Sequence, residues 1–145
     1  MNKIKITITG CLGKMGRQLI KSSQKSKDFK LVSITENRIF NEKISGLKSQ
    51  LNSKEAFKNT NIIVDFTIPK CTLEVLKVAS NLKKRVVIGT TGFSKKEENL
   101  IKNYSKKIPI LKAGNMSLGI NLLMYLTEIT SKSLGDNFLN KVFEI

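Results

Sequence analysis

The sequence predicts an α/β fold built on a doubly wound parallel sheet, and three features carry this prediction. Short apolar runs rich in β-branched residues alternate along the chain with longer segments of helical periodicity. A glycine-rich turn separates the first such run from the first helical segment. Later runs are followed by Gly, Thr, Ser or Asn residues, and ligands bind at the carboxyl ends of strands in folds of this class.

The first part of the chain predicts two strands separated by a helix. Residues 3–9 are expected to form a strand, because β-branched residues alternate there with other residues. A helix is expected at residues 13–25 and a second strand at 31–35. Residues 37–52 are polar and contain Gly and Ser, so an irregular loop is expected there. The apolar side of the first helix is expected to consist of Met15, Leu19 and Ile20.

The middle of the chain predicts a short helix, a buried strand and a longer helix. Residues 53–59 are expected to form the short helix, with Ser53 as its N-cap. Residues 62–66 are apolar apart from Asp65, and such a segment is typical of a strand covered on both faces. Pro69 is suited to the first turn of a helix, and this helix is expected to extend to about residue 82.

The next segment predicts two more strands on either side of a polar helix. Residues 85–88 are apolar and short, as expected of another buried strand. Residues 94–106 are expected to form the helix, because Ser94 and Glu97 have the spacing of a capping box. Residues 108–111 are expected to form a fifth short strand.

The last segment predicts a long apolar helix at residues 118–133 and the start of one more strand at 138–145. The alternation of strands and helices up to this helix predicts a single α/β domain.

Lysine dominates the charge of the chain. The 145 residues carry 26 Lys and Arg against 11 Asp and Glu, which gives a formal net charge of +15, and only three of the basic residues are Arg. Nucleic-acid sites favour Arg and aromatic side chains, yet aromatic residues make up only 6% of this chain. We therefore expect a basic surface that attracts small anions and no nucleic-acid partner, with a nucleic-acid-binding protein as a weaker alternative.

Composition also limits which kinds of site and which cellular location are expected. No apolar stretch approaches the roughly 18 residues that a helix needs to cross a bilayer, so we expect no membrane association and a cytoplasmic protein. Two cysteines and no histidine exclude a disulfide framework and a Cys/His zinc site, and no metal site is expected. The absence of histidine also removes the side chain that most often transfers protons near neutral pH.

The glycine-rich turn has the spacing G-x-x-G-x-x-G, with Gly10, Gly13 and Gly16 directly between a strand and a helix. This placement predicts a dinucleotide-binding turn of the Rossmann type. Such a turn lets backbone N–H groups approach a pyrophosphate at the positive end of a helix. Cys11 is interpreted as a small residue in a crowded turn rather than as a reactive thiol.

A ribose-binding acid is expected about 20 residues after such a turn, at the end of the second strand. Glu36 has this position. Its carboxylate would favour NAD, because it would repel a 2′-phosphate. Lys14 and Arg38 lie close in sequence, and their positive charges could weaken this preference and allow NADP to bind. Asp65 is the carboxylate at the later strand ends, and it either caps or holds a loop or has a functional role.

Four segments together resemble one enzyme family. They are K-M-G-R at residues 14–17, D-F-T at 65–67, G-T-T-G-F at 89–93 and N-M-S-L-G-I-N at 115–121. In this order and spacing they closely resemble the 4-hydroxy-tetrahydrodipicolinate reductases, also called dihydrodipicolinate reductases. Two positions depart from the family pattern. Lys14 replaces the usual Arg, and Asn37 stands where some members have Arg beside the ribose acid.

The resemblance implies NADH or NADPH as the cofactor and assigns residues to it. The pyrophosphate would be wrapped by Gly10, Cys11, Leu12, Gly13, Lys14 and Met15. The adenine ribose would be bound by Glu36. The nicotinamide side would be formed by Gly89, Thr90, Thr91, Ala113, Gly114, Asn115 and Met116.

The resemblance also implies a domain organisation. It predicts an NAD(P)-binding domain over residues 1–117, and residues 118–145 would be a linker helix and the first strand of a truncated second α+β domain. The apolar surface of the helix would pack under that second domain or serve as an ordinary core helix of the first, and the sequence leaves both alternatives open.

The resemblance implies a reaction as well. The family passes hydride from NAD(P)H to 4-hydroxy-tetrahydrodipicolinate, giving tetrahydrodipicolinate, in diaminopimelate and lysine synthesis. It implies a small dicarboxylate substrate and, for the full-length protein, a homo-oligomer, specifically a tetramer. The family's catalytic His and Lys lie in a second domain that has no counterpart here, so no catalytic residue is assigned and little turnover is expected from this chain alone. The alternative is a stand-alone dinucleotide-binding regulatory module without catalysis.

Overall fold

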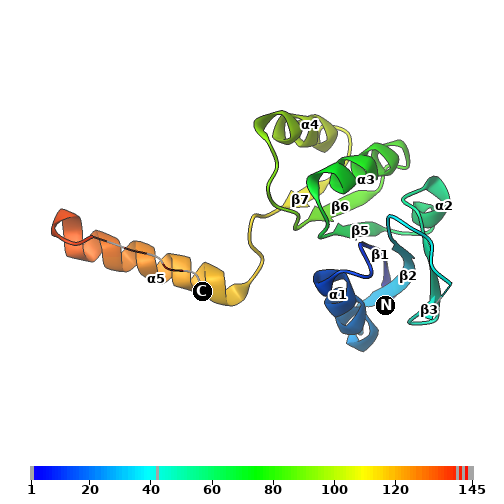
Figure 1. The fold of residues 1–145 in the computed structure, drawn as a ribbon, viewed down its shortest axis with the longest axis horizontal. Coiled ribbons are helices and arrows are strands. Elements are labelled where there is room, and N and C mark those ends of the chain that lie inside the picture. Colours follow the sequence, from blue (N-terminus) through cyan, green and yellow to red (C-terminus); the bar gives the residue numbers. More distant parts are fainter. Residues whose placement is uncertain (1, 42, 140, 142, 144–145) are drawn as a thin grey trace. The chain divides into compact units, whose positions relative to one another are not determined.

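The computed structural model describes residues 2–41, 43–139, 141 and 143. The chain forms two compact units, Met1–Gly114 and Asn115–Ile145. The first unit is an α/β domain, and the second consists mainly of one long helix (Figure 1). The division into domains at residues 1–117 and 118–145, which the sequence analysis expects, is not tested by these units and stays a prediction.

The first unit is organised around a single sheet with the strand order β3-β4-β2-β1-β5-β6-β7. All neighbouring strands pair in parallel except β3 and β4, which form an antiparallel edge. The strands are β1 (Ile4–Thr9), β2 (Phe29–Thr35), β3 (Lys43–Ile44), β4 (Leu47–Gln50), β5 (Ile62–Asp65), β6 (Arg85–Ile88) and β7 (Ile110–Lys112). The predicted doubly wound, Rossmann-like sheet is confirmed.

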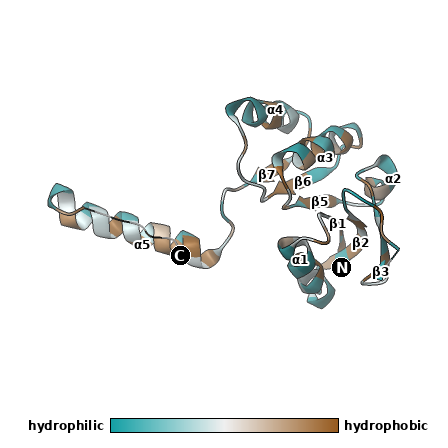
Figure 2. Ribbon diagram, in the orientation of Figure 1, coloured by the Kyte–Doolittle hydropathy of each residue, from teal (hydrophilic) through white to brown (hydrophobic). Residues whose placement is uncertain are grey.

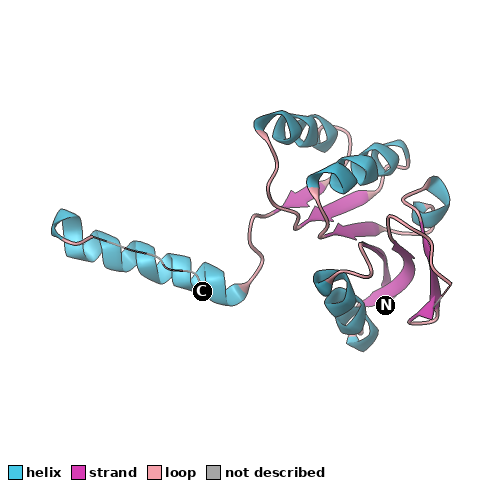
Figure 3. Cartoon of the chain, viewed as in Figure 1, coloured by secondary structure: helices cyan, strands magenta, loops and turns pink. Residues whose placement is uncertain are grey.

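Helices connect the parallel strands and cover both faces of the sheet. Figure 3 shows α1 on one side of the strands and α3 and α4 on the other. The helices of the first unit are α1 (Lys14–Lys25), α2 (Lys54–Phe57), α3 (Pro69–Asn81) and α4 (Lys95–Ser105).

Three of these helices begin as the sequence predicts. The hydroxyl oxygen of Ser53 accepts from the backbone N–H of Ala56 at 3.2 Å, and Pro69 opens α3. Ser94 and Glu97 form the expected capping box, in which Oε2 of Glu97 accepts from the backbone N–H of Ser94 at 2.8 Å. These hydrogen bonds lower the pKa of Glu97.

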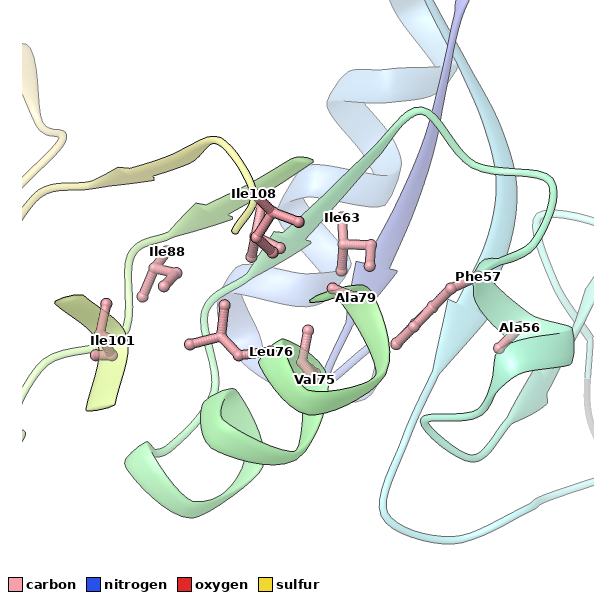
Figure 4. Packing of buried hydrophobic residues seen from close by; sticks show 10 residues of the cluster. Ala56, Phe57, Ile63, Val75, Leu76, Ala79, Ile88, Ile101 and Ile108 are labelled. Carbon is pink, nitrogen blue, oxygen red and sulfur yellow. The ribbon is translucent and has the colours of Figure 1, made fainter. Parts of the chain in front are cut away.

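Two apolar clusters lie on opposite faces of the sheet. The cluster between α1 and the sheet includes Ile6, Ile8, Ile20 and Ile34. The larger cluster joins α2, α3 and α4 to β5 and β6, and Figure 4 shows its side chains converging on one another. Its buried members are Ala56, Phe57, Ile63, Val75, Leu76, Ala79, Val86, Ile88, Ile101 and Ile108. The two clusters fix the positions of the strand ends, where the candidate site is found.

The structure corrects the loop expected at residues 37–52. β3 and β4 form a hairpin within this stretch, and β4 adds to the sheet by pairing with β2. The two-residue turn between them is Ser45-Gly46, with φ of 54° and 78°, which is the backbone of a type I′ turn. The Ser-Gly pair is a turn signal in the sequence, but the short strands beside it are too polar to show a periodic pattern.

Smaller corrections concern the faces and ends of elements. Met15 is 46% exposed, so it does not belong to the buried side of α1, whereas Ile20 is buried. The strand expected to reach residue 66 ends at Asp65. The strand expected at residues 108–111 is β7, which begins at Ile110, and Ile108 before it packs in the larger cluster.

The second unit contains α5 (Leu118–Leu134) and a short 3₁₀ turn, η1 (Gly135–Asn137). Figure 2 shows that apolar residues are concentrated in the first half of α5. The helix is confirmed, but half of the positions in the strand expected at 138–145 lie outside the described residues. Among the residues that the structure describes, no helix combines the length and apolarity needed to span a membrane.

Candidate functional site

The candidate site lies where the strand order changes direction, at the carboxyl ends of β1 and β5. The chain runs outward from β1 to β2 on one side and continues from β5 to β7 on the other. Loops that leave β1 and β5 therefore separate, and ligands bind in the resulting crevice in sheets of this kind.

The glycine-rich turn after β1 is closely packed onto the start of α1. Gly10 has φ of 64°, and its carbonyl accepts from the backbone N–H of Gly13 at 3.0 Å. A Cβ on Gly16 would lie 2.0 Å from the same carbonyl oxygen, so α1 approaches the turn at a distance that only glycine allows. Gly13 is the N-cap and offers no side-chain cap to α1. The first N–H groups of α1 are thus left for a ligand, and the helix dipole favours an anionic one.

Glu36 lies against this turn. Oε2 of its carboxylate accepts from the backbone N–H of Leu12 at 3.0 Å, and Oε1 accepts from the backbone N–H of Asn37 at 2.9 Å. β2 places Glu36 there, because the backbone N–H of Glu36 continues the pairing with β4 by donating to Gln50 at 2.9 Å. The structure therefore brings the predicted ribose-binding acid and the predicted phosphate-binding turn together.

Cys11 lies inside the turn and is fully buried. Burial, followed by the Glu36 carboxylate, raises the pKa of the Cys11 thiol to about 11. The thiol is therefore protonated at neutral pH and is a poor nucleophile, which agrees with its interpretation as a small packing residue.

Two adjoining hollows lie beside the turn. One of about 460 Å³ is lined by Glu36, Asn37, Leu51, Asn52, Ile68, Lys70, Cys71 and Glu74. The other, of about 260 Å³, extends to Gly10, Gly13, Phe66 and Thr67. Both are lined by Glu36, Asn37, Asn52, Ile68 and Cys71. A ligand that touched the glycine-rich turn could thus continue past Glu36 into the larger hollow.

Sequence reasoning missed several residues of these hollows. Asn52 is brought in by β4, and its Nδ2 donates to Sγ of Cys71 at 3.3 Å. Ile68 and Lys70 flank the proline that opens α3, so the rule that ligands bind beyond strand ends could have pointed to them. Asn52 carried no such signal, because the polar β4 was not predicted.

In the loop after β6, two neighbouring threonines differ in exposure. Thr90 is 2% exposed, and its hydroxyl donates to Oδ2 of Asp65 at 3.1 Å, whereas Thr91 is exposed. The backbone N–H of Gly89 donates to the carbonyl of Asp65 at 2.8 Å, and a Cβ on Gly89 would lie 2.0 Å from the Phe66 ring. The buried Thr90 side chain therefore fixes the loop to Asp65, whereas the Thr91 side chain faces outward.

The remaining predicted residues form three pairs, two in the first unit and one in the second. Ala113 and Gly114 follow β7 in the first unit, where the backbone N–H of Ala113 donates to the carbonyl of Ile88 at 3.3 Å. Asn115 and Met116 belong to the second unit, and the structure describes them within that unit only. Lys14 and Met15 open α1 and are exposed at the turn.

Comparisons with known proteins decide the family. A family model described as "Dihydrodipicolinate reductase, N-terminus" matches residues 4–116. The chain belongs to this family. Over all of its length the chain is 65% identical to the 4-hydroxy-tetrahydrodipicolinate reductase of Pelagibacter ubique (strain HTCC1062), of which it covers 56%. It is 40% identical to the enzyme of the same name from Buchnera aphidicola subsp. Acyrthosiphon pisum (strain Tuc7), with 92% of this chain and 54% of that protein covered.

Solved structures show the same fold. The structure of a dihydrodipicolinate reductase from Paenisporosarcina sp. TG-14, described as bound to dipicolinate, is similar with a TM-score of 0.73 and 20% identity. It aligns with 89% of this chain and 54% of its own. A homoserine dehydrogenase from S. aureus is similar with a TM-score of 0.64, 16% identity and 78% of this chain covered. The dihydrodipicolinate reductase family resemblance seen in the sequence is thus confirmed, and the chain spans about half the length of the curated relatives it matches.

Proposed function

We propose that the chain is the dinucleotide-binding part of a 4-hydroxy-tetrahydrodipicolinate reductase that acts in diaminopimelate and lysine synthesis. The observation that carries the proposal is the contact between the glycine-rich turn and Glu36 beside two connected hollows. The relatives are named as reductases of 4-hydroxy-tetrahydrodipicolinate, and the family resemblance implies tetrahydrodipicolinate as the product. The complete enzyme would take a small dicarboxylate substrate, act as a homo-oligomer and be located in the cytoplasm.

The residues present fit NADH or NADPH. Gly10 and Gly13 have no side chains and line the hollow beside Glu36, so the backbone of the turn can come close to a pyrophosphate. The first N–H groups of α1 would donate to the phosphates, and Glu36 would accept from ribose hydroxyls. In the first unit, Gly89 and Thr91, followed by Ala113 and Gly114, would form the nicotinamide side. The bound cofactor supplies the hydride, while this chain binds and orients it.

The alternative of a stand-alone regulatory module is not favoured. The relatives are reductases that continue well beyond the matched region, since the chain covers 56% and 54% of the two described above. The family's catalytic His and Lys belong to the part without a counterpart here. We therefore propose that this chain provides cofactor binding and that the proton donor comes from outside residues 1–145.

Dinucleotide binding tests the proposed function directly. We expect NADH or NADPH to raise the temperature of thermal unfolding, because a ligand that binds only the folded state stabilises it by about 2.7 kcal/mol at 100 times its dissociation constant. Scanning calorimetry of the 145-residue chain, with each nucleotide at millimolar concentration, is the measurement. ATP and inorganic pyrophosphate serve as controls for simple attraction to a basic surface. No shift with either dinucleotide would contradict the proposal.

Glu36 is expected to set the preference between NADH and NADPH, and we propose that it favours NADH. Glu74 lines the same hollow, so its lining carries two carboxylates and one lysine, Lys70, and a 2′-phosphate bound there would be repelled. Replacing Glu36 with Gln keeps an oxygen for the Leu12 N–H but removes the charge. We expect the ratio of the NADPH to the NADH dissociation constant to fall about tenfold, which corresponds to about 1.4 kcal/mol.

Titration calorimetry with both nucleotides measures this ratio. Glu128→Gln is the matched control, because it removes the same charge from an exposed position on α5. The proposal for Glu36 would be wrong if the two variants changed the ratio equally.

A further inference from the structure

Asp65 has a role that the sequence left open, and its surroundings define it. The residue is fully buried at the end of β5. Its Oδ1 accepts from the hydroxyls of Thr9 at 2.5 Å and Thr67 at 2.7 Å. Its Oδ2 accepts from the hydroxyls of Thr72 at 2.5 Å and Thr90 at 3.1 Å. An ionised carboxylate has about four acceptor positions, so these four hydroxyls use all of them.

The four threonines come from four different segments. Thr9 ends β1 and precedes the glycine-rich turn, Thr67 lies in the loop after β5, Thr72 is in the first turn of α3, and Thr90 lies in the loop after β6. A single buried carboxyl group thus ties together the segments that surround the candidate site. Because its acceptor positions are filled, Asp65 is not available as a general base.

The residues after Asp65 fit between the two ligand-binding loops. A Cβ on Gly10 would lie 2.6 Å from Cγ2 of Thr67, and a Cβ on Gly89 would lie 2.0 Å from the ring of Phe66. The side chains of Phe66 and Thr67 therefore contact the backbones of Gly89 and Gly10, respectively. The segment 65–67 is a spacer that sets the separation of the glycine-rich turn from the loop after β6.

The hydrogen bonds of Thr90 lock this spacer to the loop. Its hydroxyl donates its only hydrogen to Asp65 and accepts from the backbone N–H of Thr67 at 2.9 Å. Without the carboxylate, the Thr90 hydroxyl would lose its acceptor, and buried polar groups that lose a partner drive local rearrangement. The backbone of Gly89 and Thr91 would then no longer be held in one position.

We propose that Asp65 is a positioning residue that acts through Thr90 and fixes the loop after β6 relative to the glycine-rich turn, and so sets how the nicotinamide half of the cofactor is held. This proposal rests on the proposed function, because it assigns that loop to the nicotinamide side.

The proposal predicts that a change at Asp65 weakens the binding of NADH more than the binding of its nicotinamide-free part. Asp65 also contacts Thr9 and Thr67 beside the glycine-rich turn. That turn is held by further hydrogen bonds that do not involve Asp65, from the N–H of Leu12 to Glu36 and from the N–H of Cys11 to the carbonyl of Thr35. We therefore expect contacts with the adenosine and phosphates to depend less on Asp65 than contacts with the nicotinamide, which depend on the loop that Thr90 links to it.

The experiment compares the whole dinucleotide with its nicotinamide-free part. In the 145-residue chain with Asp65→Asn, we expect the dissociation constant of NADH to rise about tenfold or more, because hydrogen bonds to a charged group are among the stronger ones. The dissociation constant of ADP-ribose should change less than about twofold. Asp28→Asn is the control, because it removes a negative charge from an exposed loop. Equal weakening of NADH and ADP-ribose would show a merely structural role and overturn the proposal.

Two threonine variants keep the test decisive if Asp65→Asn does not fold. Thr90→Val and Thr72→Val each remove one hydroxyl from the same Oδ2 atom, so their effects on stability should be similar. Only Thr90→Val should weaken NADH more than ADP-ribose. In the double variant Asp65→Asn/Thr90→Val, the selective loss should equal that of either single variant. A selective loss in Thr72→Val of the same size would contradict the proposed route through Thr90.

A ligand-free measurement separates failure of this proposal from failure of the proposed function. The Thr67 backbone N–H donates to the Thr90 hydroxyl, so Asp65→Asn or Thr90→Val should increase its hydrogen-exchange rate about tenfold or more. The backbone N–H of Asn61, which donates to the carbonyl of Lys5 at 2.8 Å, is the internal reference, and its exchange rate should be unaffected. If the unaltered chain bound neither NADH nor ADP-ribose, the proposed function would fail while faster Thr67 exchange still supported the coupling. Unchanged Thr67 exchange would overturn the coupling itself.

Discussion

Replacing Gly16 with Ala is expected to abolish dinucleotide binding. The added Cβ would lie 2.0 Å from the carbonyl oxygen of Gly10, 2.8 Å from its carbonyl carbon and 3.0 Å from the Cα of Cys11. All three are backbone atoms, so no change of a side-chain rotamer relieves the clash. Either α1 moves away from the turn or the turn itself is displaced, and both remove the N–H groups from a pyrophosphate.

The cost in stability should be clear as well. Overpacking of a close contact lowers the free energy of unfolding by about 1–3 kcal/mol, and the loss here should lie at the upper end because the contact is between backbones. Titration calorimetry with NADH and NADPH, together with chemical denaturation, measures both effects. Gly119→Ala is the matched control. It adds the same methyl group to another helical glycine, where the nearest atom is Oγ of Ser117 at 3.9 Å. Retained binding in Gly16→Ala would show that the turn tolerates displacement and does not cradle the phosphates.

The site could be predicted where a local pattern determines the geometry. The spacing of Gly10, Gly13 and Gly16 reflects a turn that must pass under a helix, and Glu36 follows from the length of one helix and one strand. Both therefore lie where the sequence places them. Asn52 could not be found in this way, because it reaches the site through β4, whose pairing with β2 depends on contacts distant in sequence.

The role of Asp65 also could not be predicted from the sequence alone. A lone carboxylate at a strand end is compatible with catalysis, binding or support, and its sequence neighbours do not decide between them. Its partners Thr9 and Thr90 lie 56 and 25 residues away, and only the parallel order of β1, β5 and β6 brings them together. Likewise, the apolar positions of α1 predicted a buried side that includes Met15, but Met15 is 46% exposed, whereas Ile20 is buried.

Replacing Phe57 with Ala is expected to cause the largest loss of stability. Phe57 is the largest fully buried side chain of the first unit, and it packs in the cluster formed with α3 and the sheet. Figure 4 shows its ring extending from α2 toward Val75 and Ala79. α2 is only four residues long and is not stable by itself, so it stays in place through this ring and its cap at Ser53.

Truncation to Ala would remove the buried area and leave a cavity between α2 and α3, at a cost of about 3–5 kcal/mol. The temperature of thermal unfolding should fall by about 10 °C or more for a domain of this size. Phe29→Ala is the control, because Phe29 is 39% exposed and should cost about 1 kcal/mol or less. Phe57→Leu should cost about 1–1.5 kcal/mol, since it keeps most of the apolar volume. An Ala variant no less stable than the Leu variant would mean that α2 can collapse onto α3. In that case Ser53, rather than the ring of Phe57, would anchor the short helix that precedes β5.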